Sequence, residues 1–133
     1  MVAFISYGFF WISLIFLIVM PGMSDAATPP NDMAMGCYLF IWGILSVILF
    51  AGTIAKKAPI MLSIVFFTVV ILFALLAGSH WAALDAQKAW GKVAGIEGVI
   101  CGLSAIYMAA AEILNSLSGK TILWVGIRSY ASP

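Results

Sequence analysis

Four long apolar runs dominate the chain, and each is close to the length that a helix needs to cross a membrane. They cover approximately residues 2–20, 35–54, 60–78 and 93–114. About 20 apolar residues in a helix span the hydrocarbon core of a bilayer. Because lipid offers no hydrogen-bonding partner to the backbone, such runs fold as helices. The sequence therefore predicts an all-α polytopic membrane protein with four transmembrane helices, in one transmembrane domain covering residues 1–133.

Composition excludes most other classes. The chain is 65% hydrophobic and 8% charged, whereas soluble domains are nearer half apolar and a quarter charged. It has no basic run that could follow a phosphate backbone, so nucleic acid is not an expected partner. His80, Cys37 and Cys101 stand apart in sequence, and we expect neither a metal site nor a cofactor, with the cysteines packing as small apolar groups rather than forming a disulfide. No nucleophile–base set points to an enzyme.

The segments between the runs mark the loops. The stretch "PGMSDAATPPND" is polar and holds three of the five prolines, which favours a loop. The tail, residues 115–133, is too broken by polar residues for a further span, and its "TILWVGI" is expected at the interface or against the bundle. A cleaved signal peptide is the alternative for the first run, since "SDAAT" offers small residues for cleavage. Such a peptide needs a basic start, and no Lys or Arg precedes Lys56.

The distribution of Lys and Arg predicts the orientation. With four spans, Lys56 and Lys57 fall on the same side as the tail, and this side should be cytoplasmic. We therefore expect both termini in the cytoplasm. The cationic residues counted are Lys56, Lys57, Lys120 and Arg128 on that side, and Lys88 and Lys92 on the other.

Polar residues inside the runs are the most informative ones, because polar atoms in hydrocarbon need a partner or a water-filled cavity. Ser6, Tyr7 and Gly8 interrupt the first run together. An interfacial tyrosine would explain Tyr7 but not its two small neighbours. The other intramembrane hydroxyls are expected to bond the carbonyl four residues before them in the helix. These are Ser13, Ser46 and Thr68.

Two acidic positions in the fourth run stay open to more than one interpretation. Glu97 could lie at headgroup depth beside Lys88 or Lys92, or it could have a function inside the membrane. Glu112 and Asn115 could clamp the end of the helix, or act on a solute.

The fourth run also carries a row of small residues, which we call the small-residue stripe. It consists of Gly98, Gly102, Ala105 and Ala109. Small side chains at such spacing let another helix approach closely. The alternative is that the stripe lines a passage, where missing side chains leave room for a solute.

Read together, four stretches resemble the last four helices of the acetate uptake transporter family. This family comprises the YaaH-type succinate–acetate permeases, which are related to the fungal ammonia/acetate exporters. The resemblance covers nearly the whole chain and is most distinctive at "SYG-x-FW" and "CG-x-SAIY". The matching stretches are "FISYGFFWISL", "YLFIWGILSVILFAGT", "SIVFFTVVILFALLA" and "GVICGLSAIYMAAAEILNSLSGKTIL".

The resemblance implies transport of small carboxylates, acetate and succinate foremost, in a proton-coupled or channel-like manner. It implies six helices per protomer, a hexameric homo-oligomer in the prokaryotic inner membrane, and a solute path through each protomer. Tyr7 matches a tyrosine that narrows this path, and Val69 stands where the family has a leucine. Ala105 matches a small residue that bears on substrate choice.

Combined with the resemblance, the polar interruptions indicate how a carboxylate could pass. The expected donors are the hydroxyls of Ser6, Tyr7 and Thr68, with Gly8 also facing the path, and the spans hold no Lys or Arg that would capture an anion tightly. A hydrophobic girdle of Phe66, Phe67 and Val69 would gate by dewetting.

The family's first helix begins with Asn-Pro-Ala-Pro-x-Gly-Leu, and this chain has no such stretch. We therefore expect the chain to correspond to a family member without its first two helices. The alternative to a transporter is a non-transporting assembly subunit or an inactive fragment.

Overall fold

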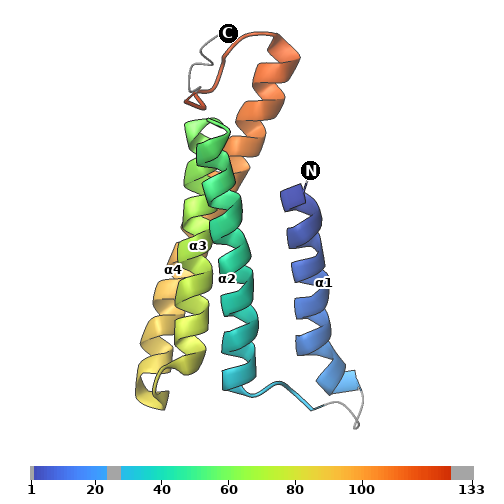
Figure 1. Cartoon of the computed structure of the whole chain (residues 1–133), viewed down its shortest axis with the longest axis vertical. Coiled ribbons are helices and arrows are strands. Elements are labelled where there is room, and N and C mark those ends of the chain that lie inside the picture. The colour runs from blue at the N-terminus through green and yellow to red at the C-terminus, as the bar shows by residue number, and fades with distance from the viewer. Residues whose placement is uncertain (1, 24–27, 127–133) are drawn as a thin grey trace.

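The computed structural model describes residues 2–23 and 28–126 of the chain. These residues form four α-helices and no strand (Figure 1). Each helix is long and apolar enough to cross a membrane, so the predicted all-α class with four membrane-spanning helices is confirmed. Asp25 of the first loop and Arg128 of the tail lie outside the described residues. The helices are α1 (Val2–Met23), α2 (Asp32–Ala55), α3 (Ile60–Trp81) and α4 (Leu84–Ser118).

Consecutive helices alternate in direction. The starts of α1 and α3 lie at the same end of the molecule as the ends of α2 and α4 (Figure 1). The central helix is α3, which packs closely against both α2 and α4. In contrast, α1 stands to one side of α2, with a wider separation between the two ribbons (Figure 1).

The helices run further than the apolar runs that predicted them. Pro21 lies in the last turn of α1 rather than beyond its end. Proline has no backbone N–H, so at this position the helix loses one hydrogen bond to a carbonyl of the preceding turn. The fourth helix begins at Leu84, although its apolar run starts near residue 93. The added turns are rich in Ala, Gln and Lys, which favour helix, and Asp85 interacts well with the helix start. Only Ala82 and Ala83 therefore separate α3 from α4.

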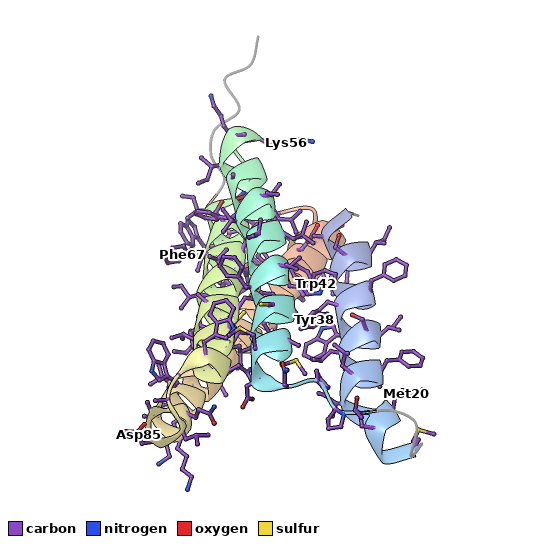
Figure 2. The ribbon with its side chains drawn as sticks, turned by 60° about the horizontal axis from the view of Figure 1, so that its bottom comes forward. Met20, Tyr38, Trp42, Lys56, Phe67 and Asp85 are labelled. Carbon is purple, nitrogen blue, oxygen red and sulfur yellow. The ribbon has the colours of Figure 1, made fainter. Side chains whose placement is uncertain are left out.

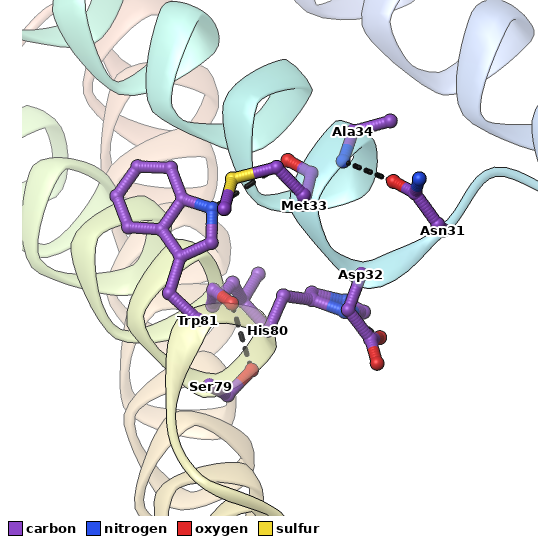
Figure 3. A network of polar contacts seen from close by, with 8 residues as sticks. Asn31, Asp32, Met33, Ala34, Ser79, His80 and Trp81 are labelled. Atoms are coloured by element: carbon purple, nitrogen blue, oxygen red, sulfur yellow. Dashed lines mark hydrogen bonds and ion pairs between the residues drawn. The ribbon is translucent and has the colours of Figure 1, made fainter.

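The contact between α2 and α3 depends on glycine. A Cβ atom at Gly36 would overlap the indole ring of Trp81, and one at Gly43 would lie 3.3 Å from the Cβ of Phe73. The end of α3 is further tied to the start of α2, where the His80 Nδ1 atom lies 3.0 Å from a carboxylate oxygen of Asp32 (Figure 3). Together, α2 and α3 pack closely along much of their length.

The small-residue stripe is only partly used between α3 and α4. A Cβ at Gly98 would lie 3.5 Å from Leu72, but Gly102, Ala105 and Ala109 are exposed. The face of α4 that packs on α3 lies beside the stripe and carries the buried residues Ala94, Cys101, Met108 and Ala111. Most of the stripe is thus left uncovered in the single chain.

The segment after α4 folds back onto the bundle, which was one of the two expected positions for it. Val125 is buried against Met108 and Ala111. Asn115 holds this segment with both ends of its side chain. Its Oδ1 accepts hydrogen bonds from the Ile122 and Leu123 amides at 2.6 and 2.9 Å, and its Nδ2 donates to the Leu123 carbonyl at 2.8 Å.

The same segment also completes the start of α3. Pro59 precedes this helix without a side-chain cap. Instead, the amides of Ile60 and Met61 donate to the carbonyls of Gly126 and Val125 at 2.8 and 3.1 Å. Two donors that a helix start would otherwise leave unpaired are therefore satisfied by residues from the far end of the described chain.

Candidate functional site

Two tyrosine–serine pairs join α1 to α2. The Tyr7 hydroxyl on α1 donates to Ser46 Oγ on α2 at 3.0 Å. The reverse pair consists of Ser13 on α1 and Tyr38 on α2, whose hydroxyl oxygens are 2.5 Å apart. Tyr38 also lies 3.1 Å from the carbonyl of Phe10, to which it donates. The two pairs fix the antiparallel register of the helices. Tyr7, earlier on α1, pairs with Ser46, later on α2, whereas Ser13, later on α1, pairs with Tyr38, earlier on α2.

Aromatic rings fill the space between the pairs. We call Phe10, Tyr38, Trp42 and Phe73 the aromatic cluster. Phe10 is its centre, with 4% of its surface exposed, and its ring centroid lies 5.0 Å from that of Phe73. Tyr38 and Trp42 project from the side of α2 that faces α1 (Figure 2). Side chains, rather than close backbones, therefore make the contact between α1 and the other helices.

The two residues expected to narrow a solute path both lie beside this cluster. Tyr7 and Val69 both pack against the buried group that contains Phe10 and Phe73. The Tyr7 ring also stacks near Phe66 and Phe73, with centroids 6.4 and 6.5 Å away. Residues that are far apart in the sequence thus surround one location between α1 and α3.

The other expected path residues lie in different surroundings. Phe66 is buried, whereas Ser6 and Thr68 are partly buried. Ala105, on α4, and Gly8 are exposed, and a Cβ at Gly8 would meet no atom within 4 Å. Phe67 is half exposed and faces Phe50 of α2. The structure therefore gathers Tyr7, Phe66 and Val69, but it does not bring Gly8 or Phe67 to them.

The three intramembrane hydroxyls expected to bond the backbone do so, although two of them use a nearer carbonyl. Ser46 donates to the Trp42 carbonyl four residues back at 2.8 Å. Ser13 and Thr68 donate to carbonyls three residues back, at 2.9 and 2.8 Å. Ser46 has a second interaction besides this backbone bond, since its oxygen also accepts a hydrogen bond from the Tyr7 hydroxyl.

A layer of polar groups crosses the bundle at one depth. Along α2 and α3, Gly43 faces Phe73, so the antiparallel register places Ser46 close to the level of residue 70. Along α3 and α4, Gly98 faces Leu72, and the Cys101 thiol lies beside the Thr68 side chain. Tyr7 belongs to the same level through its bond to Ser46. We call this set the polar layer: Tyr7, Ser46, Thr68, Glu97 and Cys101.

Glu97 differs from the other members of this layer. Its Oε2 atom is buried and has no hydrogen-bond partner among the described residues. Lys88 and Lys92 are exposed, and neither forms an ion pair with it in the described part of the chain. Glu97 is thus partly buried on α4 and is not paired with either of these lysines.

Three members of this region were not singled out as site residues from the sequence. Ser46 was interpreted only as bonding its own helix, and Cys101 only as a small apolar group. Phe10 gave no polar signal at all. The sequence did contain a signal for Ser46. Each of the first two apolar runs holds a tyrosine and a serine, and two antiparallel helices can pair each tyrosine with a serine of the other helix.

Other features of the site can be stated briefly. In residues 2–23 and 28–126 there is no group of three or more His, Cys, Asp or Glu side chains that could hold a metal ion. Glu112 is exposed and takes no part in the clamp that Asn115 forms. An open surface depression near the end of α4 is lined by Glu112, Ile113, Ser116 and Leu117, away from the polar layer.

Comparison with known proteins identifies the family. A profile of the GPR1/FUN34/yaaH family matches residues 1–124. The chain is 43% identical over 126 residues to the succinate-acetate/proton symporter SatP of Escherichia coli (strain K12), covering 93% of this chain and 63% of that protein. A protein of Methanothermobacter thermautotrophicus is 35% identical over 128 residues, covering 92% of this chain and 60% of its own length.

The structure of the bacterial acetate channel SatP is similar over nearly the whole length of this chain. It superposes with a TM-score of 0.85 at 40% identity, covering 94% of this chain and 66% of that one. The chain thus spans slightly less than two thirds of the relatives that it matches. Family profile, sequence identity and fold agree, and the chain belongs to the GPR1/FUN34/yaaH family.

Proposed function

We propose that the chain takes part in moving small carboxylates, such as acetate and succinate, across a membrane. One observation carries the proposal: Tyr7 of α1 and Val69 of α3 pack against the same buried group, which contains Phe10 and Phe73. Relatives of this chain are named a succinate-acetate/proton symporter and an acetate channel. In this proposal the phenol and the valine form the narrow part of the solute path, and the phenol supplies its polar wall.

The chemistry of this location suits a weakly bound anion. The Tyr7 hydroxyl donates a hydrogen bond to Ser46 at 3.0 Å. An arriving carboxylate can replace Ser46 as the acceptor of this bond, while Ser46 keeps its own bond to the Trp42 carbonyl. Phe66 and Phe73 flank the phenol and exclude water around it. Conduction requires binding that is favourable enough for entry and weak enough for release. A single hydroxyl that donates one hydrogen bond meets that need better than a fixed cation.

Flux through proteoliposomes tests the proposal. The whole chain is reconstituted, and uptake of labelled acetate and succinate is compared with that of empty liposomes. Substituting Tyr7→Ala removes both the donor and the narrow point, so we expect acetate uptake to change by about tenfold, the effect of about 1.4 kcal/mol. Phe9→Ala is the matched control, because Phe9 lies on the exposed side of the same helix. Equal uptake by the Tyr7→Ala variant and the original chain would contradict the constriction role.

The rival function is a non-transporting assembly subunit. The uncovered part of the small-residue stripe supports it, since Gly102 and Ala109 leave space for a further helix. The proposed homo-oligomer, a hexamer by family resemblance, would use the same kind of surface. Measuring oligomer size and flux on one preparation separates the two, because an assembly subunit would form the oligomer and conduct nothing.

We also propose that both termini face the cytoplasm of a prokaryotic cell, in its inner membrane. The start of α1 and the end of α4 lie at one end of the bundle, together with Lys56, Lys57 and Lys120 (Figure 1). A cysteine introduced at Lys120 should react with a membrane-impermeant thiol reagent only after the cells are opened. Reaction in intact cells would reverse the orientation.

A further inference from the structure

We propose that Glu97 is a proton-binding gate, which lets a carboxylate pass only while its own carboxyl group carries a proton. The inference rests on the proposed transport of carboxylates and adds to it a named group that links passage to pH.

The first support is the surroundings of Glu97. It lies in the interior of α4, and its buried Oε2 atom has no hydrogen-bond partner among the described residues. Glu97 as a whole is only partly buried, but in its ionised form this one oxygen is shielded from water and has no compensating donor in the described part of the chain. Charged side chains inside membrane spans are costly for this reason, and they are typical of proton relays and ion pathways. The neutral, protonated form avoids this cost.

The second support is the set of charges around it. In α3, which packs against α4, the one titratable side chain is His80, which lies in the last turn and is paired with Asp32. On α4 itself, the Cys101 thiol is the ionisable group next to Glu97, and Tyr7 of α1 lies beyond that thiol. No lysine or arginine of the described residues forms an ion pair with Glu97. Nothing there would stabilise a permanent negative charge.

The third support is depth. Glu97 and Cys101 belong to the polar layer, which includes the hydroxyls of Tyr7 and Ser46. A carboxylate that reaches the Tyr7 hydroxyl therefore comes to the level at which Glu97 lies. Two negative charges near each other in a medium of low dielectric constant repel strongly. When Glu97 binds a proton from water, that repulsion disappears and the protonated oxygen becomes a hydrogen-bond donor.

The test compares the pH dependence of flux in the original chain and in Glu97→Gln. Glutamine has the shape of a protonated glutamate but does not titrate in this range. We expect uptake by the original chain to fall as the pH rises, by up to about tenfold per pH unit once the carboxyl group of Glu97 is mostly ionised. After subtraction of the leak through empty liposomes, Glu97→Gln should keep its uptake at the higher pH. Glu112→Gln is the matched control, because Glu112 lies exposed on the same helix, and it should keep the original profile.

A second measurement needs no transport. Infrared spectra of the original chain minus those of Glu97→Gln should contain the carbonyl band of a protonated carboxylic acid, recorded at a pH at which a glutamate in water, with its usual titration at about 4.3, is ionised. A difference spectrum with only the ionised carboxylate bands would overturn proton binding. If the original chain moves acetate and Glu97→Gln has the same pH profile, the gate alone is refuted. If the original chain moves no carboxylate, the proposed function fails, and the gate fails with it.

Discussion

The contacts on the two sides of α2 are made in opposite ways. Toward α3, α2 presents glycine, so that the Trp81 indole lies against the backbone at Gly36 and the Cβ of Phe73 lies close to the backbone at Gly43. Toward α1, it presents Tyr38 and Trp42, and the two helices touch through rings and hydroxyls. Close backbone packing gains dispersion energy along a whole helix. Aromatic contacts concentrate the energy in a few side chains and leave polar groups between the helices.

This difference suggests that the two contacts differ in how they respond to substitution. The α2–α3–α4 group is held by many small contacts, so it forms a stable frame. The docking of α1 depends on Phe10 and on two hydroxyl pairs, so it should be sensitive to single substitutions. The expected path residues Tyr7 and Val69 lie at the sensitive contact, and a passage between closely packed glycine faces would have no room for a solute.

Removing the Phe10 ring should break the α1 contact most severely. Phe10 is buried at the centre of the aromatic cluster, and Phe→Ala substitutions in cores cost about 3–5 kcal/mol. We expect Phe10→Ala to lower the free energy of unfolding in detergent by about 3 kcal/mol, with α1 released before the other helices. Labelling of a cysteine placed at Leu14, which packs against the same buried group, would detect that release. Phe9→Ala, on the exposed side, should change little, and equal effects of the two variants would refute the concentrated contact.

Adding one methyl group should test the frame. At Gly36 a Cβ has no room beneath Trp81, and overpacking of this kind costs about 1–3 kcal/mol. We expect Gly36→Ala to lower the thermal unfolding temperature and to weaken the bond from Trp81 Nε1 to the Met33 carbonyl (Figure 3). Gly52→Ala is the control on the same helix, because a Cβ at Gly52 meets no atom within 4 Å. If both alanines behave alike, glycine does not set the α2–α3 distance.

The hydroxyl pairs should contribute least. A double-mutant cycle of Tyr7→Phe and Ser46→Ala isolates their interaction from the packing of the ring. Hydrogen bonds between membrane helices average about 0.6 kcal/mol in such cycles, and we expect a coupling of that size. Reversible unfolding in detergent mixtures measures it. A coupling above about 2 kcal/mol would mean that the hydroxyls, rather than Phe10, dominate the docking of α1.

The sequence predicted the helices well because their signal is local. Twenty consecutive apolar residues have few alternatives in a membrane, and all four runs became helices. The ends were less predictable, since helix propensity extends α4 back to Leu84 while hydropathy there is lower. The site was only partly predictable. Tyr7 stood out as a polar interruption, but nothing local shows that the buried ring beside it would be Phe10.

The polar layer illustrates the same limit. Glu97 had two interpretations because its sequence neighbours Lys88 and Lys92 suggested an interface. On the helix, Lys92 and Glu97 are five residues apart, which places them on different faces. Whether Glu97 lies opposite Thr68 or opposite lipid depends on the register between α3 and α4, and that register follows from packing across the whole interface.

The backbone bonds from Ile60 and Met61 to Gly126 and Val125 have a consequence for the order of synthesis. When the ribosome has made α3, the partners for its first two amides do not yet exist, and they emerge only after all of α4. Until then these donors must be satisfied by water or lipid headgroups. The amino end of α3 is therefore one of the last parts of the bundle to mature, although the helix itself lies at its centre.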